Sequence, residues 1–207
     1  MFMQFLSIGL MMLFSAMLPG PDFALVTKNT LLYSRRAGIC TTFGIVAGAL
    51  VHISYCALGL AVVISNSIIL FNIIKYVGAC YLIYIGITSL FSRQSKHISL
   101  SIKHKKNMIS GYKAFYQGFL CNLLNPKATL FFLALFTLVI DADKPKWWTV
   151  ALGLELLVIV LLWFSLLTFI LSHPRVVKNL ERAEKYIAKF LGLFLMSFGV
   201  ALIFIRK

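Results

Sequence analysis

The sequence predicts an all-α integral membrane protein with about six transmembrane helices. Of the 207 residues, 60% are hydrophobic and 13% are charged, whereas soluble chains carry roughly 25% charge. The mean hydropathy is +0.92. The apolar residues form long runs, and roughly 20 helical residues span a hydrocarbon core of about 30 Å. The runs lack the alternation of a membrane barrel, so helices are the structure that satisfies their backbone in lipid.

Six segments are long enough to span the membrane, and they are numbered here as spans 1 to 6: 4–26, 38–64, 68–91, 112–140, 147–171 and 186–205. Span 1 lacks the basic start and the cleavage site of a signal peptide, so it is expected to be a mature helix. The chain is therefore predicted to be a single transmembrane domain. Its predicted parts are a first repeat at about 1–92, a basic cytoplasmic loop at 93–111 and a second repeat at about 112–207.

The basic residues predict the orientation. Of the 20 lysines and arginines, 14 lie in or beside the connections between spans 1 and 2, 3 and 4, and 5 and 6. The positive-inside rule places these connections in the cytoplasm and both termini on the outer side of a bacterial inner membrane. The net charge of +14 therefore indicates orientation and contact with anionic lipid, and nucleic-acid binding is not expected.

Two proline-containing stretches interrupt spans 1 and 4. They are Pro19-Gly20-Pro21 and Asn125-Pro126, and the segments around them align on Pro21 and Pro126. Proline removes a backbone hydrogen bond and clashes with the preceding turn, so both helices are expected to break or kink. Because each repeat has three spans, the two halves would be inverted relative to each other, which is the plan of many secondary transporters.

The basic residues also predict the depth of the two breaks. Pro21 precedes Lys28 by about 10 Å of helix, and Asn125 follows Lys113 by about 18 Å. Both breaks are therefore expected between the cytoplasmic surface and the membrane midplane. Two broken helices at matching depth indicate a transporter's substrate site.

A charged residue follows each break directly: Asp22 after Pro21, and Lys127 after the second proline. Ionisable groups within a membrane are costly and indicate function. Asp22 is suited to the ammonium of a zwitterionic amino acid, and Lys127 with the amides freed at the breaks is suited to its carboxylate. Gly20 and Asn125 are predicted to belong to the same substrate-binding site. The alternatives are that the two charges pair only with each other, or that one side chain reaches the cytoplasm.

Two further ionisable residues are candidates for proton coupling. His52 lies near the middle of span 2, and histidine is a side chain suited to proton transfer at physiological pH, although a hydrogen-bonded packing role is the alternative. Glu155 is the only acid of span 5, and an interfacial position is its alternative. Gly44 and Gly48 form a GxxxG step, which indicates close helix packing, either within the fold or between the protomers of a homodimer.

Motifs for soluble enzyme chemistry are absent from the sequence. The chain has no Gly-rich phosphate loop ending in Lys-Ser/Thr, no HExxH motif and no clustered Cys and His ligands. It is therefore predicted not to be an enzyme, and neither a cofactor nor a metal is expected.

Five stretches together resemble one family: PGPDFALV (19–26), RRAGICTTFGIVAGALVHISYCALGLA (35–61), YVGACYLIYIG (76–86), FYQGFLCNLLNPKATLFFLA (115–134) and GLFLMSFGVAL (192–202). In this order and spacing they resemble the lysine-exporter (LysE/RhtB-type) amino-acid efflux family, across nearly all of the chain. The resemblance implies export of amino acids or close derivatives from the cytoplasm, driven by the proton motive force. It also implies that the residues at the two breaks, from Pro19 to Pro21 and from Asn125 to Lys127, occupy the characteristic positions of the family.

One departure from the family concerns the outer end of span 4. Such proteins often read FLPQF after the second break, where this chain has LFTLV (135–139). This leaves the substrate open. Two alternatives also remain: a transporter of the same fold for another solute, such as a metal cation or a sugar, and a membrane scaffold that transports nothing.

Overall fold

The computed structural model describes residues 2–91, 109–139, 145–172 and 174–204. Within these ranges the chain forms eight α-helices and no strand, which confirms the predicted class. The helices are α1 (Phe2–Met17), α2 (Pro21–Leu32), α3 (Arg35–Asn66), α4 (Ile68–Phe91), α5 (Gly111–Leu123), α6 (Pro126–Val139), α7 (Lys146–Leu171) and α8 (Pro174–Phe204).

The two interrupted spans are bent helix pairs. The axes of α1 and α2 meet at 58°, and those of α5 and α6 meet at 57°. Both bends fall at the predicted prolines. The helices α3, α4 and α7 are each long and apolar enough to cross a membrane alone, so the described residues hold up to five spans when each bent pair counts as one. The predicted sixth span lies in the second half of α8, whose apolar part, Lys189–Phe204, is shorter than the other spans.

Two helices extend beyond the predicted apolar spans where the chain becomes basic. α2 continues to Leu32, past the predicted end of span 1 at residue 26, and α8 begins at Pro174, well before residue 186. Hydropathy marks where a helix is apolar, but its backbone hydrogen bonds continue into polar surroundings. Proline also favours the first position of a helix, which suits the start of α8.

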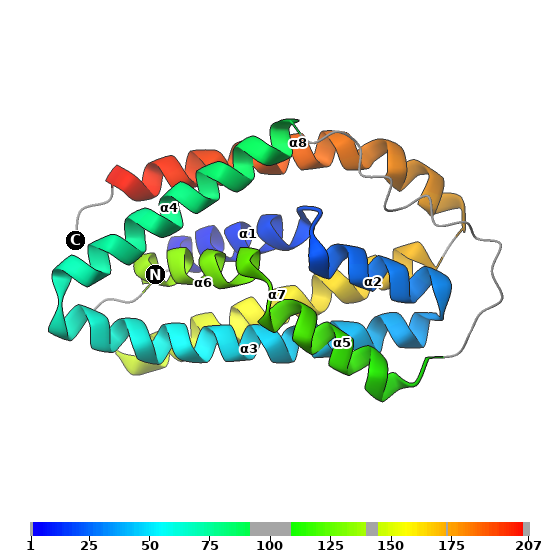
Figure 1. The fold of residues 1–207 in the computed structure, drawn as a ribbon, viewed down its shortest axis with the longest axis horizontal. Coiled ribbons are helices and arrows are strands. Elements are labelled where there is room, and N and C mark those ends of the chain that lie inside the picture. The colour runs from blue at the N-terminus through cyan, green and yellow to red at the C-terminus, as the bar shows by residue number, and fades with distance from the viewer. Residues whose placement is uncertain (1, 92–108, 140–144, 173, 205–207) are drawn as a thin grey trace.

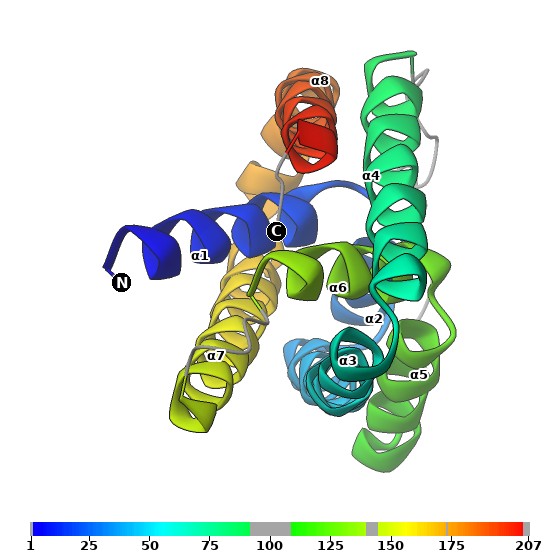
Figure 2. The same cartoon turned by 90° about the vertical axis from the view of Figure 1, so that its left-hand side faces the viewer.

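The helices form two close pairs, and the other helices lie between or beside them (Figures 1 and 2). On one side α4 packs along α8, and on the other α3 packs along α5. Between the two pairs in Figure 1 lie α1, which packs against α7 and α8, and α6, which packs against α3 and α4. The turns that end α1 and α5 therefore come together in the interior of the bundle.

The GxxxG step brings α3 against α5. A Cβ atom added at Gly44 would collide with the carbonyl oxygen of Phe115, and one at Gly48 would lie 2.9 Å from the Cβ and Oδ1 atoms of Asn122. Only glycine lets the two backbones approach this closely. Of the two alternatives left by the sequence, the step therefore serves packing within the fold.

The outer surface is apolar, as expected for a protein that has lipid as its solvent. Large hydrophobic side chains such as Leu58, Ile69 and Leu162 are more than half exposed. The buried core instead collects around α6 and α7, where Phe132 and Leu152 are almost fully enclosed.

Candidate functional site

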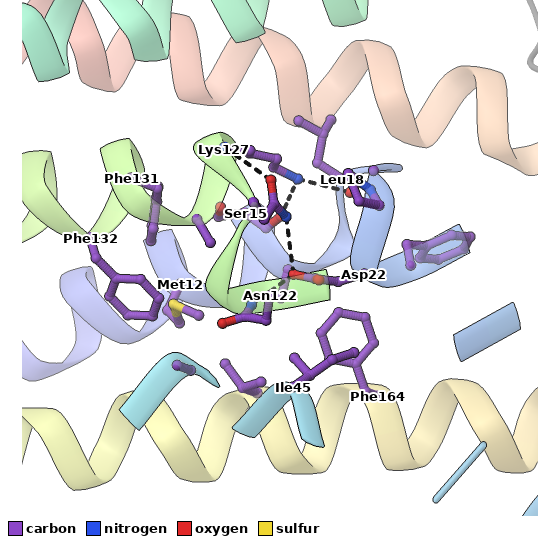
Figure 3. A pocket seen from close by; sticks show the side chains of 18 residues that line it. Met12, Ser15, Leu18, Asp22, Ile45, Asn122, Lys127, Phe131, Phe132 and Phe164 are labelled. Carbon is purple, nitrogen blue, oxygen red and sulfur yellow. Dashed lines mark hydrogen bonds between the residues drawn. The ribbon is translucent and has the colours of Figure 1, made fainter. Parts of the chain in front are cut away.

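The two helix breaks border one small cavity of about 40 Å³. Its lining includes all four predicted binding residues, Gly20, Asp22, Asn125 and Lys127, together with the helix-break residue Pro21. The structure therefore brings together side chains that lie about 100 positions apart in the sequence (Figure 3). The remaining helix-break residues, Pro19 and Pro126, lie in the same turns but do not line the cavity.

Local sequence explains why each second half-helix begins where it does. Pro21 occupies the first turn of α2, and Asp22 follows it there, where the positive end of the helix dipole favours a carboxylate. α6 begins in the same way at Pro126. The side chain of Asn125 caps α6 by accepting a hydrogen bond of 3.0 Å from the backbone nitrogen of Lys127.

Asp22 is held by two amides from the other break. The Nδ2 atom of Asn122 donates a hydrogen bond of 2.8 Å to Oδ2 of Asp22. The Nδ2 atom of Asn125 donates to the same oxygen at 3.3 Å. The second carboxylate oxygen, Oδ1, is buried and has no hydrogen-bond partner. A buried, unpaired carboxylate oxygen is costly, and a ligand with an N–H donor would satisfy it.

Lys127 reaches the opposite break. Its Nζ atom donates to the carbonyl oxygens of Ser15 at 2.9 Å and of Leu18 at 3.0 Å. These carbonyls belong to the end of α1, where helix carbonyls lack partners and the dipole favours a cation. The Lys127 ammonium therefore binds the end of α1, and no direct hydrogen bond or ion pair joins it to Asp22 within the described residues. Asp22 instead accepts from the two asparagine amides, and the thiol of Cys121 also interacts with it.

The breaks lie near the middle of the bent spans. α1 has 16 residues and α2 has 12, whereas α5 has 13 and α6 has 14. Twelve helical residues extend about 18 Å. Lys28 lies within α2, which continues to Leu32, so the length of helix between Pro21 and Lys28 is only part of this half-span.

His52 does not line the cavity but contacts a residue that does. Its Nε2 atom lies 3.0 Å from the backbone oxygen of Asn122, and its Nδ1 atom lies 2.6 Å from the hydroxyl of Tyr55. A carbonyl only accepts, so Nε2 carries the proton in this contact. The ring also stacks on Phe132 with centroids 5.6 Å apart. The structure thus places His52 as a fully hydrogen-bonded, buried residue beside the site.

Glu155 lies in a different place. It borders a groove of about 360 Å³ between α1 and α7, whose other lining residues are apolar. Its Oε2 atom is buried and lacks a hydrogen-bond partner. A Cβ atom at Gly9 would lie 2.8 Å from Oε1, so glycine on α1 makes room for this carboxylate. Glu155 and the cavity at the breaks are therefore separate features.

Asn122 is the site residue that the sequence reasoning missed. It is buried, lines the cavity and contacts Asp22. The available signal was its position three residues before Asn125, which is close enough for the Asn125 backbone nitrogen to donate a hydrogen bond of 3.0 Å to the Asn122 carbonyl in the turn between the helices. A polar side chain within an apolar span was a second signal.

The fold and the site define a polytopic membrane protein with a polar cavity at two helix breaks, an arrangement typical of secondary transporters. The family model described as LysE type translocator matches residues 13–205. This chain therefore belongs to the LysE type translocator family, which makes it a transporter and not an enzyme.

The chain is similar to known proteins over most or all of its length. The chain is 34% identical to the uncharacterized membrane protein YrhP of Bacillus subtilis (strain 168), over 88% of this chain and 90% of that protein. It is 29% identical to the threonine efflux protein of Escherichia coli (strain K12), over the full length of both. It is 25% identical to the uncharacterized membrane protein YahN of the same organism, over 90% of this chain and 82% of that protein. No solved structure matches the chain.

Proposed function

We propose that this protein exports amino acids or close derivatives from the cytoplasm by secondary transport. The family and the full-length similarity to a threonine efflux protein support this class of cargo. The observation that carries the proposal concerns Asp22, which lines the cavity. Its Oδ1 atom is buried and has no hydrogen-bond partner. An ammonium group would supply the missing charge-assisted hydrogen bond.

The opposite end of a zwitterionic substrate has donors available at the same breaks. The first turns of α2 and α6 leave backbone N–H groups without helical partners, and the helix dipoles favour an anion there. Lys127 adds positive charge nearby while it holds the end of α1. The chemistry of both ends of an amino acid is thus represented around one cavity.

Transport requires this cavity to open. A volume of about 40 Å³ holds only a few waters, so the cavity is too small for an amino acid in the described conformation. Rocking of one repeat against the other would open it first to the cytoplasm and then to the outside. The basic connections support the orientation with both termini outside.

We further propose that efflux is coupled to proton entry, with Glu155 as the proton carrier. The buried, unpartnered Oε2 atom of Glu155 supports this assignment, because a protonated carboxyl is cheaper than a carboxylate in apolar surroundings. His52 fits the role less well, since both of its ring nitrogens already have partners.

A metal cation is the less favoured cargo. Cation sites use several oxygen ligands with more than one carboxylate in many cases. Asp22 is the only acidic residue in the lining of the cavity as described. The geometry therefore favours an ammonium over a metal ion.

The test is efflux from proteoliposomes loaded with a panel of radiolabelled amino acids, with and without an imposed proton gradient. The proposal predicts that one or a few amino acids leave the vesicles, and that the gradient accelerates their loss. If no amino acid moves in protein shown to be folded, the proposed cargo is wrong. Gradient-independent efflux would retain the cargo but contradict proton coupling.

A further inference from the structure

We propose that the groove between α1 and α7 is a second binding site, which takes a hydrophobic amine whose ammonium group pairs with the carboxylate of Glu155. The two helices pack against each other (Figure 2), and both supply residues to the groove. This inference goes beyond the proposed function, because it concerns a ligand other than the exported molecule and can be tested by binding alone.

The groove has the size and the lining of a small-molecule site. Its volume is about 360 Å³, and ligand sites of about 300–1,000 Å³ are mostly apolar with a few polar groups. Four leucines of the lining are at least 40% exposed: Leu6, Leu10, Leu162 and Leu166. On a membrane protein this exposed face meets lipid, so a ligand would reach the groove from the hydrocarbon layer.

Glu155 is the only charged residue in the lining of the groove as described. Its Oε2 atom is buried and unpartnered. Its Oε1 atom lies beside Gly9, another lining residue, where an added Cβ atom would be 2.8 Å away. Within the described ranges of the chain, no hydrogen bond or ion pair reaches this carboxylate. The groove therefore holds a negative charge that lacks a cation.

The complementary ligand is a cation that carries its own apolar surface. A lone carboxylate in apolar surroundings is costly, and a bound ammonium supplies both the opposite charge and N–H donors. A hydrated metal ion would lose its waters without gaining oxygen ligands, because the rest of the lining is apolar apart from the indole nitrogen of Trp163. An alkyl or aryl body would instead bury apolar area against the leucines.

Trp163 lies further along the same wall of the groove. It follows Glu155 by two turns of α7, which is about 12 Å of helix. Its indole nitrogen is buried and has no hydrogen-bond partner. The ammonium and the indole would therefore contact different parts of one ligand, and the indole can report its presence.

The depth of Glu155 favours a free amine over a lipid headgroup. α7 begins at Lys146, so about 14 Å of helix separates Glu155 from the nearer end of α7. Phosphatidylethanolamine carries an ammonium, but its headgroup lies at the membrane surface. Reaching this depth would draw its phosphate into a hydrocarbon core of about 30 Å. A hydrophobic amine dissolves in that layer without this cost.

Occupancy would also affect transport, and this consequence rests on the proposed function. A proton and an ammonium would compete for the same carboxylate. A bound amine would therefore slow gradient-driven efflux without entering the cavity at the helix breaks.

The experiment measures quenching of tryptophan fluorescence in phosphatidylcholine vesicles that contain the full chain. The two probes are an alkylamine and the alcohol with the same brominated chain, because bromine quenches an indole that it contacts. The wild type is expected to bind the amine at a mole fraction about tenfold or more below that of the alcohol, the effect of a hydrogen bond to a charged group. Trp163→Phe should remove the saturable part of the quenching.

Two carboxylate variants separate pairing with Glu155 from general attraction of a cation. In Glu155→Gln the amine should lose its advantage over the alcohol. Asp22→Asn, which neutralises the carboxylate at the helix breaks, is the matched control and should keep the advantage. If Glu155→Gln does not fold, Gly9→Ala takes its place, because its added Cβ atom would displace Oε1 and should weaken binding of the amine alone.

Three results would overturn the proposal. Equal binding of amine and alcohol by the wild type would leave the groove to the chains of lipids. An advantage of the amine that persists in Glu155→Gln would place the cation elsewhere. Loss of the advantage in vesicles of phosphatidylethanolamine would assign the groove to the lipid headgroup, whereas a free amine is expected to keep its advantage there.

Discussion

Asn122 at the end of α5 donates a 2.8 Å hydrogen bond to Asp22 at the start of α2, which joins the two helix breaks directly. Lys127 makes the reverse connection, from the start of α6 to the carbonyls at the end of α1. Each bent span therefore supplies its charged residue to the break of the other. Opening one break must disturb the other, which would couple the two bent helix pairs during transport.

The contact between Lys127 and α1 predicts a structural role that can be measured apart from transport. Lys127→Met keeps the length of the side chain but removes both hydrogen bonds to the α1 carbonyls. We expect a loss of about 2–4 kcal/mol in stability, because two charge-assisted hydrogen bonds are lost within the protein. Thermal unfolding in detergent measures this loss. Lys28→Met on the exposed face of α2 is the control, and an equal effect in both variants would contradict the role.

The close approach of α3 and α5 predicts a sharp difference between two glycines of the same helix. Gly44→Ala would force a Cβ atom into the Phe115 carbonyl oxygen, whereas a Cβ atom at Gly59 meets nothing within 4 Å. Overpacking of this kind costs about 1–3 kcal/mol, and Gly59→Ala should be neutral or stabilising by up to about 1 kcal/mol. Melting temperatures of the two variants give the comparison. Equal stability would show that the helices separate easily at this point.

The packing of His52 predicts that its variants change affinity and not proton coupling. His52→Gln retains a side-chain N–H that can reach the Asn122 oxygen, and His52→Leu does not. We expect the KM for the exported amino acid to rise several-fold in His52→Leu and to recover largely in His52→Gln. The acceleration of efflux by a proton gradient should persist in both. Its loss in both variants would instead assign His52 to the proton pathway.

Glu155 is expected to show the opposite behaviour. Glu155→Gln removes the titrating group but keeps the shape of the side chain in the groove between α1 and α7. We predict that gradient-driven efflux falls to the rate seen without a gradient, while exchange of labelled for unlabelled amino acid continues, because exchange needs no net proton movement. Both rates can be measured in one vesicle preparation. Unchanged gradient dependence would exclude Glu155 as the proton carrier.

The sequence was sufficient for much of the fold because the decisive signals are local. Apolar length identifies the spans, and proline breaks a helix wherever it occurs, so the bends at Pro21 and Pro126 were predictable. Hydropathy does not indicate where the helices end. Leu32 and Pro174 lie where hydropathy has already fallen, but the helical hydrogen bonds continue to these residues.

The partners within the site depend on contacts between distant segments, which local patterns do not define. The sequence placed Asp22 and Lys127 at the breaks but left open whether they pair with each other. In the structure Asp22 accepts a hydrogen bond from Asn122, 100 residues away in the sequence. Lys127 donates hydrogen bonds to carbonyls of α1. Main-chain carbonyls carry no sequence signature, so this second contact could not be inferred from residue types.

Efflux by wild type and Asp22→Asn under the same proton gradient tests the central claim most directly. Asparagine keeps the size of the side chain but removes the charge that faces the ammonium. We predict that kcat/KM for the exported amino acid falls about 100-fold or more, the effect of losing about 3 kcal/mol of interaction with a buried charge. A folded Asp22→Asn protein that exports amino acids at the wild-type rate would contradict the account and move the substrate site away from the two helix breaks.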